Sequence, residues 1–222
     1  MTDYGIEIRN ADDIIIVDST YKNYVYHQHG TANVVAHLNE IDINDVDTSA
    51  LFFVIPPSGI YAATYGFVKN GSVYDKIIIA ASASGIVNWI VYKEIEDTTV
   101  SGFGLIVYNT TSGVVFNSNE EKYMNVINDE YYGATGDVVV SGTTNYFGIT
   151  GGGYSWLLDS SWTPKGISRK MYGIKYVNGN TINIDLFEYF FVERDTGYSG
   201  WMSGTKTLSP NRLIEIKPPI GV

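Results

Sequence analysis

The 222-residue chain contains no cysteine, only six prolines and only three histidines. Without cysteine it can form no disulfide bond, no thiolate metal site and no cysteine nucleophile. Long runs rich in Ala, Leu, Glu and Lys are also missing, so we expect little helix. No apolar run is long enough to span a bilayer, and the first ten residues lack the basic flank and apolar core of a signal peptide. We therefore expect a soluble protein that is synthesised in a cytoplasm.

Basic residues are scarce as well, because 14 Lys and Arg stand against 24 Asp and Glu, for a formal net charge of −10. Nucleic-acid binding needs a concentrated Lys/Arg surface, which this balance argues against. Nucleophile motifs fail too: no Gly-x-Ser-x-Gly stands between a strand and a helix, and Gly151–Gly153 lacks the Gly-Lys-Ser/Thr of a phosphate loop. Carboxylates are plentiful, but nothing selects two of them for acid–base work. We expect that the protein is not an enzyme.

The chain is instead rich in aromatic residues and glycine, with 18 Tyr, nine Phe, four Trp and 23 Gly. Aromatic residues favour strands, and glycine favours tight turns. Apolar residues make up 45% of the chain, which is typical of a packed core. Asn-Gly pairs at Asn70-Gly71 and Asn178-Gly179 are the preferred residues of two-residue hairpin turns. The composition therefore predicts an all-β protein.

An internal repeat organises the chain. The stretch Gly5–Ser19, GIEIRNADDIIIVDS, returns 99 residues later as Gly104–Ser118, GLIVYNTTSGVVFNS. Each copy has the pattern of a strand, a short polar turn and a second strand, which predicts a β-hairpin. A hairpin alone buries too little apolar surface to be stable, so each copy should open a larger unit. We predict two tandem antiparallel β-sandwich-like units, covering about residues 1–100 and 101–222.

The hairpin motif resembles the N-terminal region of small tail-associated proteins of tailed bacteriophages. The motif is Tyr4-Gly5-Ile6-x-Ile8-x-Asn10 followed by Val17-Asp18-Ser19, and Phe103-Gly104-Leu105-x-Val107-x-Asn109 followed by Phe116-Asn117-Ser118 repeats it. The resemblance covers about fifteen residues in each half. It departs at Asp12-Asp13, where the Gly that is common in such turns is missing, although the second copy keeps it as Gly113.

The resemblance implies a structural component of the virion, in the tail tip, baseplate, spike or fibre, that contributes to host-surface attachment. Such a protein would be synthesised in the host cytoplasm and end in the tail. Its expected partners are other tail proteins, further copies of itself with a trimer favoured, and a glycan or protein of the host surface. The resemblance brings no catalytic residue with it.

The alternative function is that of a free carbohydrate-binding module or lectin-like β domain. Amphipathic aromatic side chains can stack on sugar rings, and the glycine-rich second half carries several of them. The candidate stacking residues are Trp156, Trp162, Tyr198 and Trp201. The competing interpretation is that most of these tryptophans belong to the core.

A metal site is the last candidate. His27 and His29 lie in the alternating run Tyr21–Gly30, which predicts a strand that closes on its glycine. Residues two apart on a strand project to the same face, so the two imidazoles could share one metal ion. A trimer with this strand on its threefold axis would offer six imidazoles, enough for an octahedral transition-metal site. The competing interpretation is an exposed strand end, and no other cofactor is expected.

Overall fold

The fold is all-β, as predicted: in the computed structural model, the described residues form strands joined by turns and contain no helix. The described part of the chain contains sixteen strands. The structure describes residues 7–9, 15–18, 23–95, 105–108, 114–117, 123–132, 135–142, 144–156, 165–194 and 204–219.

Both predicted hairpins form as two-stranded antiparallel sheets. The first pairs β1 (Glu7–Arg9) with β2 (Ile15–Asp18), and the second pairs β9 (Ile106–Tyr108) with β10 (Val114–Asn117). Each strand of the second hairpin begins and ends 99 positions after the equivalent strand of the first hairpin. The strand registers agree at the same offset, because Glu7 pairs with Asp18 as Ile106 pairs with Asn117, and the bulge recurs at the equivalent place. The repeat is therefore structural and not only a similarity of sequence.

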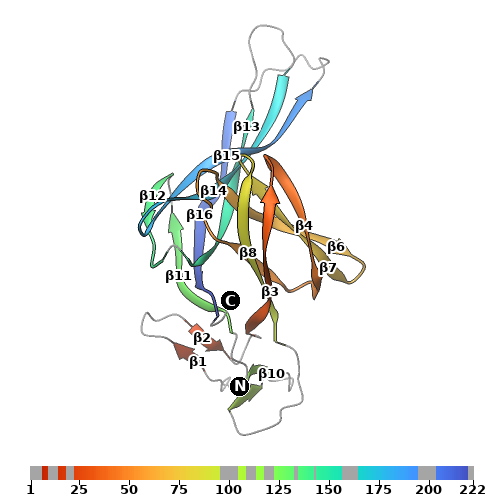
Figure 1. Cartoon of the computed structure of the whole chain (residues 1–222), viewed down its shortest axis with the longest axis vertical. Coiled ribbons are helices and arrows are strands. Elements are labelled where there is room, and N and C mark those ends of the chain that lie inside the picture. The colour runs from red at the N-terminus through yellow and green to blue at the C-terminus, as the bar shows by residue number, and fades with distance from the viewer. Residues whose placement is uncertain are drawn as a thin grey trace, which may run out of the picture.

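The remaining twelve strands form two antiparallel six-stranded sheets that pack together (Figure 1). The strands of the first half of the chain are β3 (Tyr24–Val34), β4 (His37–Asp47), β5 (Leu51–Val54), β6 (Ala62–Asn70), β7 (Val73–Ala81) and β8 (Gly85–Glu94). The strands of the second half of the chain are β11 (Asn125–Tyr132), β12 (Gly136–Val139), β13 (Tyr146–Trp156), β14 (Lys165–Asn178), β15 (Thr181–Arg194) and β16 (Gly204–Lys217).

Strand pairing shows that the two halves share a topology. The first half contains the ladders β3-β8-β5 and β6-β7-β4, and the second contains the order β11-β16-β13-β14-β15-β12. In both halves the first strand pairs with the sixth, the sixth with the third, the fourth with the fifth and the fifth with the second. Each half therefore consists of a hairpin followed by six strands, which confirms the predicted pair of sandwich-like units. Residues 1–100 and 101–222 as separate domains remain a prediction.

The two halves share one apolar core. Among the described residues, the backbone ladders join them through two residue pairs, Val54 with Phe147 and Ala62 with Ile174, and two isolated bridges add to these. The four ladder residues lie in the largest cluster of buried side chains, which takes fully buried residues from both halves. Burial of apolar surface is the main favourable term in such packing. The association of the halves therefore depends on side chains more than on shared hydrogen bonds.

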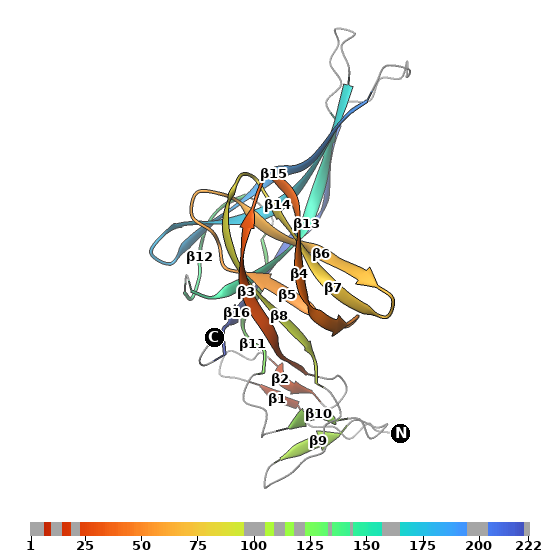
Figure 2. The same cartoon turned by 45° about the vertical axis from the view of Figure 1, so that its right-hand side comes forward.

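The two hairpins lie together at one end of the molecule in both views (Figures 1 and 2). Contacts join β2 to β10. The backbone N and side-chain Nδ2 of Asn23 both donate to the carbonyl of Val115, at 3.2 and 2.6 Å. Just beyond, Val25 forms a β-bridge with Tyr123. The segment that leaves the first hairpin is thus bonded to the second hairpin.

Glu215 on β16 is fully buried and organises the segment between β12 and β13. Its carboxylate accepts hydrogen bonds from the backbone N of Ser141 at 3.0 Å, the backbone N of Gly142 at 3.2 Å and Nδ2 of Asn145 at 2.7 Å. A buried charge is tolerated when it is hydrogen-bonded in this way. The carboxylate therefore fixes the path of the chain into β13.

We predict that Glu215→Gln lowers the free energy of unfolding by about 1–3 kcal/mol, because a neutral amide oxygen accepts weaker hydrogen bonds than the carboxylate Oε1, and an NH₂ in place of Oε2 would face the backbone N of Ser141. Urea denaturation measures this change. The matched control is Glu40→Gln, which removes one partner of an exposed ion pair with Lys76 and should change stability by less than about 1 kcal/mol. Equal effects of the two substitutions would contradict the proposed role of Glu215.

Tyr92 on β8 is a second buried polar residue, but it lacks a hydrogen bond. Its side chain is fully buried, its ring meets Phe53 edge-on at 6.1 Å, and its hydroxyl has no hydrogen-bond partner. Burial raises the pKa of Tyr92 far above its usual value, and the nearby hydroxyls of Tyr146 and Tyr26 raise it further. The phenol therefore stays neutral in the folded protein at alkaline pH.

We predict that Tyr92→Phe raises the free energy of unfolding at pH 7 by about 1 kcal/mol, because an unsatisfied buried hydroxyl is removed. Above about pH 10 the unfolded chain loses the Tyr92 proton while the folded chain keeps it, so stability falls as the pH rises. The variant should lose less stability than the parent protein over that range. Urea denaturation at pH 7 and about pH 11 measures both effects, with Tyr108→Phe, at an exposed site, as the control. An unchanged alkaline slope would contradict the prediction.

Candidate binding site

The candidate site lies where a loop of the first half crosses onto strands of the second. The loop connects β5 to β6, and Gly59 within it has a φ of 80°, a conformation that favours glycine. Ser58 forms a parallel bridge with Tyr176 on β14, and the backbone N of Tyr176 donates to the carbonyl of Pro57 at 3.0 Å. The loop is thereby held against the end of β14.

Three polar residues form a row across the strands that this loop faces. Asp137 on β12 pairs directly with Asn183 on β15, and Asn183 pairs directly with Lys175 on β14. Residues opposite one another on adjacent strands share a face of the sheet. The alternate residues Ile182 and Ile184 are fully buried in the core on the other face. The alternation along β15 thus produces one apolar face and one polar row.

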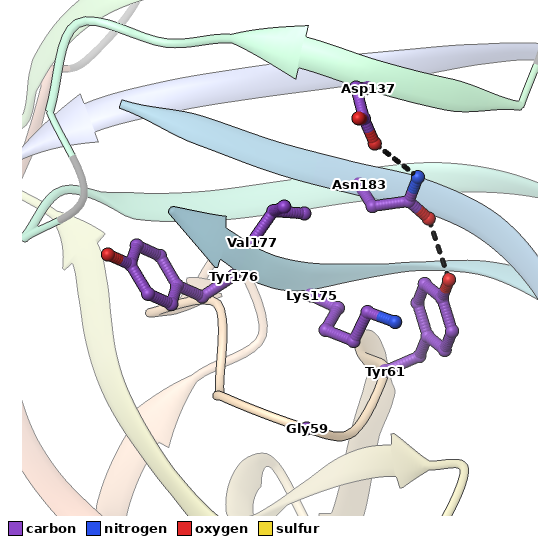
Figure 3. A pocket seen from close by; sticks show the side chains of 7 residues that line it. All are labelled: Gly59, Tyr61, Asp137, Lys175, Tyr176, Val177 and Asn183. Atoms are coloured by element: carbon purple, nitrogen blue, oxygen red, sulfur yellow. Dashed lines mark hydrogen bonds between the residues drawn. The ribbon is translucent and has the colours of Figure 1, made fainter. Parts of the chain in front are cut away.

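Tyr61, at the end of the loop, contacts this row (Figure 3). Its hydroxyl donates to Oδ1 of Asn183 at 2.6 Å, and Nδ2 of Asn183 donates to Oδ1 of Asp137 at 2.6 Å. The ring of Tyr61 stacks on Phe187 with 6.4 Å between centroids, and Nζ of Lys175 lies 4.5 Å from its centroid. The side chain of Tyr61 is therefore positioned at both its ring and its hydroxyl.

The backbone of Tyr61 is fixed as well. Its N donates to Oγ of Ser82 at 2.9 Å, and its carbonyl accepts from the backbone N of Ser82 at 3.0 Å. Ser82 follows directly after β7, a strand of the first half. Tyr61 is thus anchored to one half through its backbone and to the other through its side chain.

A pocket of about 430 Å³ lies between the loop and the polar row, within the size range of small-molecule sites. Its lining residues are Gly59, Tyr61, Asp137, Lys175, Tyr176, Val177 and Asn183. The Tyr176 ring points away from Lys175 and Tyr61, whereas the Lys175 ammonium points toward the Tyr61 ring (Figure 3). The pocket combines a cation, a carboxylate, an amide and an apolar side chain, which are groups that bind a polar ligand.

Of the predicted stacking residues, only the backbone of Trp156 lies in the described part of the chain. Trp156 is the last residue of β13, where its backbone pairs with Ile167 and Gly204. Trp162, Tyr198 and Trp201 lie outside the described residues. The aromatic platform therefore remains a prediction.

His27 and His29 have different partners in the structure. A β-bulge interrupts the β3–β8 register between Tyr26 and Gln28, so His27 departs from the alternation on which a shared face was predicted. Nε2 of His27 donates to the carbonyl of Asn44 at 3.3 Å. Nδ1 of His29 lies 2.8 Å from the hydroxyl of Tyr26.

A second bulge gives His27 a structural role. On β4, Asp42 pairs with Lys76 and Val46 pairs with Tyr74, which leaves Asn44 outside the β7 ladder. The backbone N of Asn44 donates to Oε1 of Gln28 at 3.1 Å, beside the bond from His27. These two bonds satisfy both backbone groups of Asn44 and join β3 to β4.

Metal ligation therefore remains a prediction that depends on further copies of the chain. Within the described ranges, no group of three or more His, Asp or Glu side chains is placed to hold a metal ion. The described residues also include no helix of the length and apolarity needed to cross a membrane.

No protein-family model, curated protein or solved structure matches the chain.

Gly173 lies against the ring of Phe187, on which Tyr61 stacks. A Cβ at this position on β14 would lie 2.7 Å from Cδ1 of Phe187 and 3.2 Å from the carbonyl oxygen of Ala62. The first distance is shorter than real Cβ contacts allow. Only glycine leaves room for the Phe187 ring on which Tyr61 stacks, so the position of Tyr61 depends on Gly173.

We predict that Gly173→Ala destabilises the protein by about 1–3 kcal/mol, because the methyl group displaces the Phe187 ring and with it Tyr61. The matched control is Gly66→Ala on β6, since a Cβ there meets nothing within 4 Å. Thermal unfolding compares the two variants. A Gly173→Ala protein as stable as the Gly66→Ala protein would contradict the prediction, because it would show that the Phe187 ring can move aside without a loss of stability.

Proposed function

We propose that this chain is a structural component of a bacteriophage tail, in the tail tip, baseplate, spike or fibre, and that it contributes to host-surface attachment. One observation carries the proposal. The two hairpins that bear the tail-protein motif agree in strand bounds, register and bulge, and they lie side by side at one end of the molecule (Figure 2).

The exposed surface of the second hairpin supports an assembly contact. Val107 and Val115 are buried, whereas Leu105 and Tyr108 are 49% and 52% exposed. Aromatic side chains are enriched in protein–protein interfaces, whose buried centre is more apolar than the rest of the surface. A tail protein works by assembly, so the second hairpin, with these exposed apolar side chains, is a suitable contact for its neighbours.

The proposal includes the location and the partners of the chain. It would be synthesised in the host cytoplasm and located in the tail of the virion, next to other tail proteins. Closed symmetry is the rule for homo-oligomers, and a trimer is the favoured form here. A transition metal bound by His27 and His29 would require that trimer, because one chain offers too few ligands.

The second candidate function is a free carbohydrate-binding module. The pocket at Tyr61, Asp137, Lys175 and Asn183 favours it, because polar side chains converge there on a hollow large enough for a small ligand. The two candidates differ in location. A tail component is found in purified particles, whereas a free module is absent from them.

Mass spectrometry of purified phage particles tests the location. We expect peptides of this chain in the particles, at a constant ratio to the other tail proteins across a density gradient. Peptides that remain in the soluble fraction alone would contradict the tail function and favour the free module.

We further predict that Tyr108→Lys abolishes or strongly weakens association of the purified chain with itself or with its tail partners, because a charge replaces an exposed aromatic contact. Native mass spectrometry and light scattering measure the association. The thermal midpoint should not change, since the side chain is 52% exposed. Val35→Lys, at a 59% exposed position on the β3–β4 turn, is the control and should assemble normally. Equal assembly of the two variants would exclude this edge as a contact.

A further inference from the structure

We propose that the pocket between the two halves binds a saccharide, with Lys175 and Asp137 as the residues that contact its hydroxyl groups. This site is separate from the hairpins. Saccharide binding can be measured on the isolated chain, so the result does not depend on whether the chain is part of a virion.

The hydrogen bonds within the pocket determine which groups remain for a ligand. Both ends of the Asn183 amide are engaged, one by the Tyr61 hydroxyl and the other by Oδ1 of Asp137. Asn183 is therefore a positioning residue that fixes the Asp137 carboxylate. The second oxygen of that carboxylate is left to accept a hydrogen bond from a ligand.

Lys175 supplies the complementary donor. Among the described residues its ammonium forms no ion pair, and it lies over the ring of Tyr61. A lysine ammonium has three donors, and a contact with a ring face leaves them available for ligand oxygens. A hydroxyl group can accept from Lys175 and donate to Asp137, so a polyol satisfies both residues with one kind of group.

The shape and charge of the pocket disfavour other ligand classes. A wholly apolar ligand would bury Lys175 and Asp137 without partners, which is costly. A polyanion would meet one cation beside a carboxylate, on a chain of net charge −10. A free zwitterionic amino acid would satisfy the two charges but would occupy only part of about 430 Å³.

Apolar contact and rigidity complete the site. Val177 lines the pocket two residues after Lys175 on the same strand and is 38% exposed, which gives the carbon-bound hydrogens of a sugar ring a surface. Tyr61 is held by hydrogen bonds to both halves before any ligand binds. Such preorganisation lowers the entropy cost of binding. Among the described residues that line the pocket, no aromatic ring face is free to stack flat on the sugar, so we expect a dissociation constant of about 1 mM.

Saturation-transfer NMR on the purified full chain tests the site. The probes are the methyl glycosides of glucose, galactose and N-acetylglucosamine, together with maltose and lactose. We expect at least one probe to bind, and the variants Asp137→Asn and Lys175→Met each to weaken it at least tenfold. Asp137→Asn keeps an oxygen for Asn183, and Lys175→Met keeps an unbranched side chain over Tyr61, so both variants should fold.

The matched controls are Asp45→Asn on β4 and Lys69→Met on β6, which are exposed and lie outside the pocket. They should bind the sugar as the parent protein does. Binding of no probe, binding that survives both pocket variants, or binding of glycine and alanine in place of the sugars would overturn the proposal.

Discussion

The structure depends on the burial of apolar side chains that the two halves share. Fully buried isoleucines from both halves, such as Ile79 and Ile184, lie in one cluster, while two ladder pairs and two isolated bridges connect the backbones of the halves in the described residues. Because the hydrophobic effect has no direction, it brings the halves together without setting the details of their contact. Polar groups set those details instead, and among those that cross the boundary are the bonds from Tyr61 to Asn183, from Asn23 to Val115 and from Tyr176 to Pro57.

Local features of the fold could be predicted from the sequence, because a hairpin is specified by its own residues. Both hairpins form as predicted, and a turn forms at Gly179-Asn180, one residue after the predicted Asn178-Gly179 pair, because Asn178 pairs with Thr181. The strand that was expected to close on Gly30 continues instead to Val34. Gly30 does not end it, because the glycine makes room for a ring: a Cβ there would lie 2.5 Å from Cζ2 of Trp89. A contact with a residue so distant in the sequence gives no local signal.

Only part of the candidate site could be predicted for the same reason. The turn at Gly179-Asn180 sets Asn178 opposite Thr181, and the bulge between Tyr176 and Asn178 then places Lys175 opposite Asn183. Nothing local places Asp137 on the next strand or brings Tyr61 across from the other half. The aromatic residues of the second half gave a stronger sequence signal than any residue of the pocket, because composition is visible without knowledge of strand order.

The repeat has different consequences at the hairpins and at the pocket. A β-bulge alters the local twist of its strand, so a bulge at the same place in both hairpins gives the molecule two copies of one backbone shape. The six-strand parts differ more, since β5 has four residues and its counterpart β13 has eleven. The pocket combines a β5–β6 loop with strands β12, β14 and β15, which are not equivalent parts of the repeat. The hairpins therefore share one backbone shape, whereas the pocket combines groups that the repeat does not duplicate.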